Sequence, residues 1–172
     1  MLMSFPISSK GDLIRVLDRL LVPHGFVRVK DDWYLDNGEC IAVIGLGKSF
    51  YGGQFSLGID VLLKELRPDL LPFPPRHLCH FRGYGVDVLM PDRAHLKAAL
   101  DLENDLMATE RFQTIKTGID EAVPFLMPLN SKQALAQAYH DHQDFECYCN
   151  LDLKLALERH GFLSHQDLKL DL

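Results

Sequence analysis

Apolar residues near the start of the chain recur with helical spacing. In the stretch DLIRVLDRLLVPHGF they fall three or four positions apart, so that one face of a helix carries Leu13, Ile14, Leu17, Leu20 and Leu21. The pattern predicts a helix over about residues 10–23. Gly25 can adopt the left-handed conformation that ends a helix, and Phe26 can pack back on the last turn. The same His-Gly-Phe ending at 160–162 predicts a second helix end.

After this helix the apolar positions alternate, which is typical of strands. Short strands are predicted at 26–30 and 33–35, and Asn37-Gly38 is the residue pair that a tight hairpin turn requires before a returning strand at 40–46. The next strand, 54–63, places Phe55, Leu57, Ile59, Val61 and Leu63 on one face and Gln54, Ser56, Gly58, Asp60 and Leu62 on the other. We therefore expect an antiparallel meander with one buried face.

The sequence then changes from strands to helices through a proline-rich stretch. Prolines at 68, 72, 74 and 75 predict a long, partly ordered loop over 66–85, because proline interrupts regular structure. The segment VDVLM at 86–90 is a candidate for one more strand.

Helical spacing returns at about residue 92. A helix over 92–107 would carry Glu103 inside its apolar stripe of Leu96, Ala99, Leu100, Leu106 and Met107. A second helix, from near Thr109, is expected to stop before Pro124, since the residue before a proline avoids helical geometry. Asn130 and Gln133 form a capping box for a third helix, and a fourth ends at Gly161.

Strands followed by helices predict an α+β fold. We expect an antiparallel meander sheet of about four to five strands, an N-terminal helix and a C-terminal set of about four helices packed on one face. A length of 172 residues, 47% of them hydrophobic, fits one domain over 1–172, strand-rich over 24–90 and helical over 91–162.

The charge and cysteine content narrow the classes of function. Lys and Arg number 18 against 24 Asp and Glu, a formal net charge of −6, and no basic stripe occurs, so nucleic acid is an unsuitable partner. The chain contains neither an apolar run long enough to cross a membrane nor a recognisable export signal. Four cysteines are too few for a disulfide scaffold, which favours the reducing cytoplasm.

Two stretches that lack Lys and Arg, 98–110 and 140–153, concentrate acidic residues. They have two interpretations. The acids are either solvated helix faces or a surface presented to a basic protein partner. On the second interpretation the binding residues are Asp101, Asp105, Asp144 and Glu146, with Trp33, Tyr51 and Tyr148 as aromatic anchors.

The segment HDHQDFECYCN at 140–150 invites a metal-site hypothesis. Helical geometry would group His140, Asp144 and Cys147 on one face, and His142, Glu146 and Cys149 on another. Neither set has the paired-cysteine or His-Glu-x-x-His spacing of a zinc site. A half-buried helix with core cysteines is the favoured interpretation, and no metal or cofactor is expected.

Two further segments resemble sites. The loop 76–87 offers a nucleophile, a base and an anion clamp from among His77, Cys79, His80, Arg82 and Asp87, or is a proline-stiffened excursion with incidental polar residues. Gly47-Lys48-Ser49 is similar to a phosphate-binding loop, but it lacks the glycine five positions earlier and precedes a strand. A glycine-rich strand connection is favoured there.

Several of these stretches together resemble a family of bacterial domains of unknown function. They are LLVPHGFVR, the Asn-Gly hairpin, FYGGQFSLGIDV, RGYGVDV and AVPFL, which cover about residues 10–130. The motifs are structural, so the resemblance implies the fold rather than an activity. Small acidic proteins of this kind also resemble the immunity proteins of bacterial toxin systems.

These observations lead to one expected function and two alternatives. We expect a non-enzymatic cytoplasmic protein that binds a basic partner, as an immunity protein neutralises a toxin domain. The first alternative is a small metal-binding or cysteine-dependent enzyme that uses the 76–87 loop or the 140–149 segment. The second is a regulatory small-molecule binder that uses the concave sheet face under the proline loop.

Overall fold

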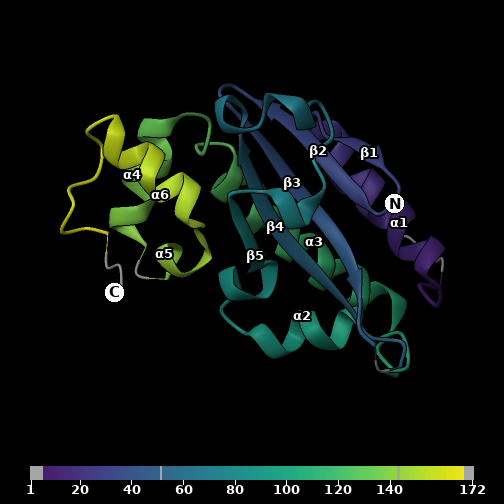
Figure 1. Ribbon diagram of the computed structural model, residues 1–172. Helices are drawn as coiled ribbons and strands as arrows, with labels where there is room; N and C mark the ends of the chain where they lie inside the picture. Colours follow the sequence, from purple (N-terminus) through teal and green to yellow (C-terminus); the bar gives the residue numbers. More distant parts are fainter. Residues whose placement is uncertain (1–5, 51, 143, 169–172) are drawn as a thin grey trace.

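A meander sheet lies at the centre of the structure (Figure 1). The computed structural model describes residues 6–50, 52–142 and 144–168, and within these ranges five antiparallel strands form one sheet in sequence order. The strands are β1 (Val27–Val29), β2 (Asp32–Asn37), β3 (Cys40–Lys48), β4 (Phe55–Leu63) and β5 (Phe81–Gly85). The predicted α+β class and antiparallel meander are confirmed.

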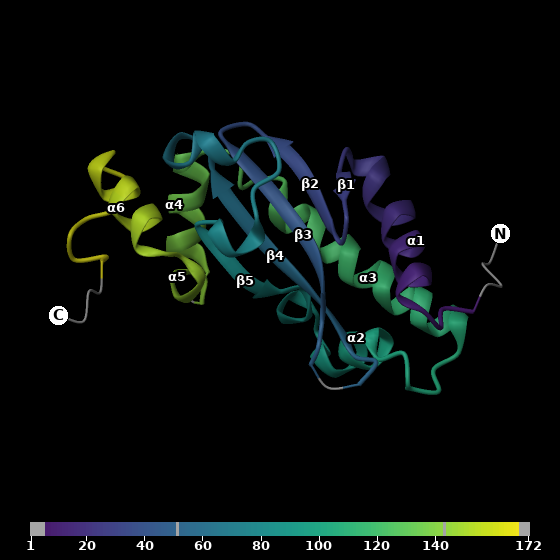
Figure 2. The same ribbon diagram turned by 45° about the vertical axis from the view of Figure 1, so that its right-hand side comes forward.

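The helices gather behind the sheet and beyond its β5 side. They are α1 (Lys10–Leu21), α2 (Arg93–Leu100), α3 (Ala108–Leu126), α4 (Lys132–Asp141), α5 (Phe145–Tyr148) and α6 (Leu151–Arg159). Figures 1 and 2 show α1 and α3 behind the sheet and α4, α5 and α6 beyond β5. No helix in the described part of the chain is long and apolar enough to cross a bilayer.

The first helix begins and ends as its sequence predicts. Ser9 and Asp12 form a reciprocal capping box at its start. At its end a short 3-10 turn leads to Gly25, whose φ of 90° is the left-handed conformation expected there. Gly161 after α6, with φ 74°, confirms the second predicted helix end.

The main core lies between the sheet and the helices behind it. All five predicted inward residues of β4 are buried, and they belong to one hydrophobic cluster with Ile115, Ile119 and Ala122 of α3. Trp33 of β2 is fully buried in the same cluster, and its Nε1 donates to Asp18 Oδ1 of α1 at 2.9 Å. The cluster reaches from Ile7 to Leu168, so α4–α6 share it.

The opposite face of the sheet is also covered, which the sequence did not predict. A smaller cluster of Tyr34, Ile41, Val43, Leu62 and Cys79 lies there, with Leu70 of the proline-rich segment packed against it. The expectation of a single buried face is therefore wrong. The segment 64–80 lies against the sheet through Leu70 and Cys79, and it forms short 3-10 turns in place of an open loop.

Four element boundaries differ from the sequence prediction. The last strand is β5, before the predicted position, because Phe81 and Tyr84 supply its buried side chains. Residues 86–89, where a strand was predicted, form a 3-10 turn. The helix at 93 ends at Leu100, because Asp101 is extended. Helix α3 continues through Pro124, since burial of Leu126 offsets the missing hydrogen bond, and Ser131, rather than Asn130, caps α4.

Candidate functional site

The hairpin between β3 and β4 presents an exposed aromatic side chain. The last pair of the ladder is Lys48 with Phe55, and Ser49 N–H donates to Gln54 O at 2.9 Å to begin the turn. Phe50 follows with its side chain fully exposed, at 102% of its reference area. Among the described residues the next regular element after Lys48 is the strand β4, so the glycine-rich strand connection is confirmed over a phosphate-binding loop.

The acidic segment 101–105 is fastened to this hairpin. Asp101 forms an antiparallel bridge with Gln54, and Leu102 N–H donates to Gly53 O at 3.2 Å. Glu103 Oε1 accepts a hydrogen bond from Gly53 N–H at 3.1 Å. A side chain at position 53 would crowd Glu103, since its Cβ would lie 3.0 Å from Cγ. We call residues 48–50, 52–54 and 101–105 the hairpin end.

A buried arginine holds the acidic segment from behind. The guanidinium of Arg111 on α3 donates to the carbonyl oxygens of Ala99, Asp101 and Asn104 at 2.7, 2.6 and 2.6 Å. Only 3% of Arg111 is exposed, and burial lowers its pKa. The side chain remains a cation that takes neutral acceptors in place of water, and it fixes the turn that ends α2. The sequence analysis missed Arg111, which lies among polar residues at helical spacing.

Acidic residues outnumber basic ones among the described side chains of the hairpin end. Glu103 and Asp105 are exposed, whereas Asp101 is half-buried and its Oδ1 accepts from Glu103 N–H at 3.0 Å. Lys48 is an exposed cation at the same end. The hairpin end thus combines a protruding Phe50 with carboxylates on a backbone that Arg111 holds in place.

The second acidic segment lies elsewhere on the molecule. Cys149 bridges to Phe81 of β5, which is paired with Val61, whereas Asp101 bridges to Gln54. Positions 54 and 61 are seven residues apart along one strand direction, or about 23 Å at the rise of an extended strand. Asp144 and Glu146 therefore do not share a surface with Asp101 and Asp105. The expectation of one combined acidic face is wrong.

The three predicted aromatic anchors have separate locations. Trp33 is fully buried and belongs to the core, so its assignment as a surface anchor is wrong. Tyr148 is half-buried and forms edge-to-face contacts with Phe81 and Tyr84, at ring-centroid distances of 6.0 and 4.9 Å. Tyr51 lies outside the described residues. The exposed Phe50, one residue earlier, was not singled out from the sequence.

The structure does not assemble the predicted metal ligands. His140 lies in the last turn of α4, which ends at Asp141, and Cys147 lies in the separate helix α5. The helical grouping of His140, Asp144 and Cys147 is therefore wrong, because the segment is not one continuous helix. Among the residues that the structure describes, no group of three or more His, Cys, Asp or Glu side chains could hold a metal ion.

The polar residues of the 76–87 loop are either buried or engaged in local hydrogen bonds and ion pairs. Burial, together with the nearby Asp60, raises the pKa of the Cys79 thiol to about 12, so this thiol is protonated at neutral pH. His80 is buried, its Nδ1 accepts from Leu63 N–H at 3.0 Å, and burial lowers its pKa. Arg82 donates to the carbonyl oxygen of His77 at 2.6 Å, and Asp87 lies 3.7 Å from Lys97. Cys79 thus lacks the environment of a nucleophile.

The part of the chain that forms the sheet, α2 and α3 matches a known protein family. A family model described as a domain of unknown function, DUF4304, matches residues 17–128. The chain belongs to the DUF4304 family. The match takes in all five strands together with α2 and α3, and it ends before α4. The resemblance to a family of unknown function is thereby confirmed. Neither the curated proteins nor the solved structures give a match.

Within the DUF4304 region, an ion pair on the outer sheet face explains two strand glycines. Asp60, only 2% exposed, accepts from Arg76 Nε at 2.5 Å and from Gly83 N–H at 2.8 Å. The guanidinium of Arg76 lies on the paired Gly45 and Gly58, where a methyl group at either position would overlap it. Arg76 therefore occupies the sheet face under the proline segment, where a small-molecule site was one of the expectations.

Proposed function

We propose that this protein acts by binding a basic protein partner, which docks on the hairpin end. The observation that carries the proposal is the full exposure of Phe50 beside the acidic segment 101–105. A large aromatic side chain in solvent adds nothing to the stability of the isolated chain. At an interface such a side chain supplies much of the affinity when it enters a pocket.

The chemistry of the partner follows from the charges around Phe50. Glu103 and Asp105 are exposed, and Glu110 in the first turn of α3 is exposed as well, so the surroundings favour Lys and Arg on the partner. Because Arg111 already holds the backbone of the acidic segment, little freedom is lost when the partner binds. Such preorganisation increases affinity.

A toxin domain with a basic surface is a partner of this kind, and neutralising it is the role of an immunity protein. We place this binding in the cytoplasm. All four cysteines, Cys40, Cys79, Cys147 and Cys149, are free thiols, which supports a reducing compartment. The buried, protonated Cys79 and the separated His140 and Cys147 give the enzyme and metal alternatives no comparable support.

The test uses co-expression with the product of the adjacent gene, where a toxin is expected. The full chain is purified at low salt, and retention of the partner is compared between the wild type and Phe50→Ala. We expect Phe50→Ala to lose at least about 2 kcal/mol of binding free energy, as interface hot spots do. The matched control is Phe73→Ala, which alters another exposed aromatic side chain, on the proline segment.

A charge-matched pair tests the location. Asp105→Lys should slow association severalfold, and more strongly at low salt, because screening is weak there. Asp144→Lys makes the same charge change at the other acidic segment and should leave the rate nearly unchanged. Equal retention by the wild type and Phe50→Ala, or equal slowing by both lysine variants, would contradict the proposal.

A further inference from the structure

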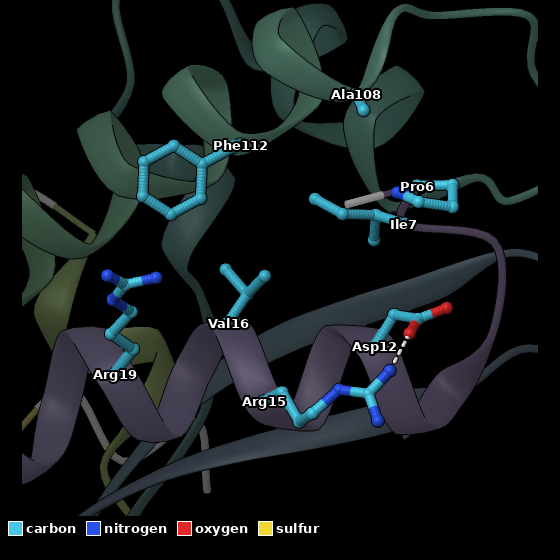
Figure 3. Close-up of a pocket in the computed structure, with 8 residues that line it drawn as sticks. All are labelled: Pro6, Ile7, Asp12, Arg15, Val16, Arg19, Ala108 and Phe112. Atoms are coloured by element: carbon cyan, nitrogen blue, oxygen red, sulfur yellow. Dashed lines mark hydrogen bonds and ion pairs between the residues drawn. The ribbon is translucent and has the colours of Figure 1, made fainter. Parts of the chain in front are cut away.

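A cavity lies between α1, α3 and the chain that leads into α1. Its volume is about 520 Å³, within the range of small-molecule sites. Figure 3 shows Phe112 of α3 facing Val16 of α1 across the space, with Pro6 and Ile7 at the opposite end from Phe112. Most of the lining is apolar, and it consists of Pro6, Ile7, Asp12, Arg15, Val16, Arg19, Ala108 and Phe112.

The two arginines of the lining differ in their partners. Arg15 forms an ion pair with Asp12. Hydrogen bonds from the Ser9 hydroxyl, which has the larger effect, and from the Ser8 backbone N–H lower the pKa of Asp12 to about 2. This carboxylate is therefore ionised and neutralises Arg15. Arg19 lies one turn further along α1 and is exposed, and it has no hydrogen bond or ion pair within the described ranges. The cavity therefore has one uncompensated cation at its Phe112 end (Figure 3).

We infer that this cavity binds a small amphipathic carboxylate, with its apolar chain between α1 and α3 and its anionic group on Arg19. The apolar walls favour a hydrocarbon chain over water. The planar guanidinium matches a carboxylate through two parallel hydrogen bonds. The ion pair of Asp12 and Arg15 carries no net charge, so the end of the cavity beside Pro6 and Ile7 offers an anion no comparable attraction.

The cavity is separate from the proposed protein-binding surface in its chemistry. The hairpin end is acidic and protrudes, whereas the cavity is concave and contains a free cation. The inference does not rest on the proposed function, and either can fail without the other.

The experiment is a heteronuclear NMR titration of the full chain with decanoate, kept below its micelle concentration. We expect saturable shifts confined to the backbone of residues 7, 12–19 and 108–112. Decylammonium has the same chain with the opposite charge, and it should bind at least roughly fivefold more weakly, the size of one solvent-exposed ion pair.

Two variants and one control identify the site. Arg19→Gln should weaken decanoate roughly fivefold and abolish the preference over decylammonium. Ala108→Phe fills the cavity and should remove binding of both probes. Arg159→Gln alters another exposed arginine, in the last turn of α6, and should leave both affinities unchanged.

Three outcomes would overturn the inference. The first is the absence of saturable binding to the wild-type chain. The second is equal affinity for the wild type, Arg19→Gln and Ala108→Phe, which would indicate nonspecific adsorption of a surfactant. The third is binding only after removal of residues 1–5, which would assign the cavity to the chain's own N-terminal residues.

Discussion

At the irregular parts of this protein, single side chains form hydrogen bonds with backbone groups that would otherwise face solvent. Arg111 is the clearest example, because one guanidinium satisfies three carbonyl oxygens where α2 ends and the acidic segment begins. Asp12 has a comparable role at the start of α1, where its carboxylate accepts hydrogen bonds from Ser8 and Ser9. Both residues belong to sequence stretches in which a charged residue is ordinarily a surface residue.

Replacement of Arg111 should destabilise the whole chain. Arg111→Met keeps much of the apolar stem but leaves three carbonyl oxygens without their donor, so we expect a loss of about 3 kcal/mol in the free energy of unfolding. Urea unfolding followed by circular dichroism measures it. Arg159→Met, at an exposed position, should stay within about 0.5 kcal/mol of the wild type. A similar small effect at both positions would contradict the role of Arg111.

The contribution of Asp12 should depend on pH in a defined direction. Its pKa falls to about 2 in the folded chain, so its stabilising effect is present above the unfolded pKa of about 4 and is lost as the pH falls through 2. Asp12→Asn should therefore destabilise by about 1 kcal/mol at neutral pH, the size of a helix cap. The difference from the wild type should shrink between about pH 4 and 2 in urea unfolding. A difference that does not change with pH would rule out the ionised capping box.

Among the elements, the turn between β2 and β3 docks against the junction of α3 and α4. The Asn37 side-chain amide donates to the carbonyl oxygens of Leu126 and Met127, each at 3.1 Å, and so satisfies the open end of α3. Glu39 N–H donates to Asn130 O at 2.8 Å, and Glu39 Oε2 accepts from Lys132 N–H at 2.8 Å. The hairpin turn thus joins the sheet to the helical part of the chain.

Gly38 should be far less replaceable than another glycine with positive φ. Its φ is 65°, and a Cβ there would lie 2.5 Å from Asn130 O, a backbone atom that cannot move aside cheaply. Gly38→Ala should therefore lose more than about 2 kcal/mol, through backbone strain and displacement of the junction. Gly161→Ala is the control, because φ is 74° but nothing lies within 4 Å, so about 1 kcal/mol is expected. Equal losses of unfolding free energy for the two variants in thermal unfolding would show that the backbone at Asn130 moves to accommodate the added methyl group.

At the scale of the whole molecule, an aromatic cluster joins the sheet to α4–α6. Phe81 of β5 stacks on Phe145 at a centroid distance of 4.3 Å, and Tyr84 stacks on Phe125 of α3 at 5.2 Å. Phe145 is fully buried. The family match ends at residue 128, so this cluster connects the DUF4304 region to the helices that follow it.

Phe145→Ala should loosen these helices in particular. A cavity at this position should lower the free energy of unfolding by about 3–4 kcal/mol. Hydrogen exchange of α4 and α6 should accelerate more than that of β3 and β4, because α4–α6 lose their packing against the sheet. Phe73→Ala, on the proline segment, should leave the exchange of α6 unchanged. Uniform acceleration across the chain would instead indicate a single cooperative unit.

The sequence predicts the regular elements well, because their signals are local. The spacing of leucines in α1, the alternation in β4 and the Asn37-Gly38 turn each follow from neighbouring residues. The buried outer face and the Arg76–Asp60 pair were missed, because they depend on the proline segment returning over the sheet. Exposure could not be inferred either, since Trp33 and Phe50 have similar polarity and the fold alone buries one and exposes the other. The separation of the acidic segments likewise follows from strand register, which periodicity does not report.

The bridge between Phe81 and Cys149 also protects the sheet from other chains. Asn150 N–H donates to His80 O at 2.8 Å, so the residues beside α5 take up hydrogen-bonding groups at the outer side of β5. A chain ending at residue 128 would contain the whole family match yet leave this strand edge and the ring of Phe81 open to solvent. Unpaired edges with apolar side chains recruit strands from neighbouring molecules. We therefore expect the shortened chain to aggregate as its concentration rises. In the full chain, α4–α6 prevent this self-association by covering the strand edge.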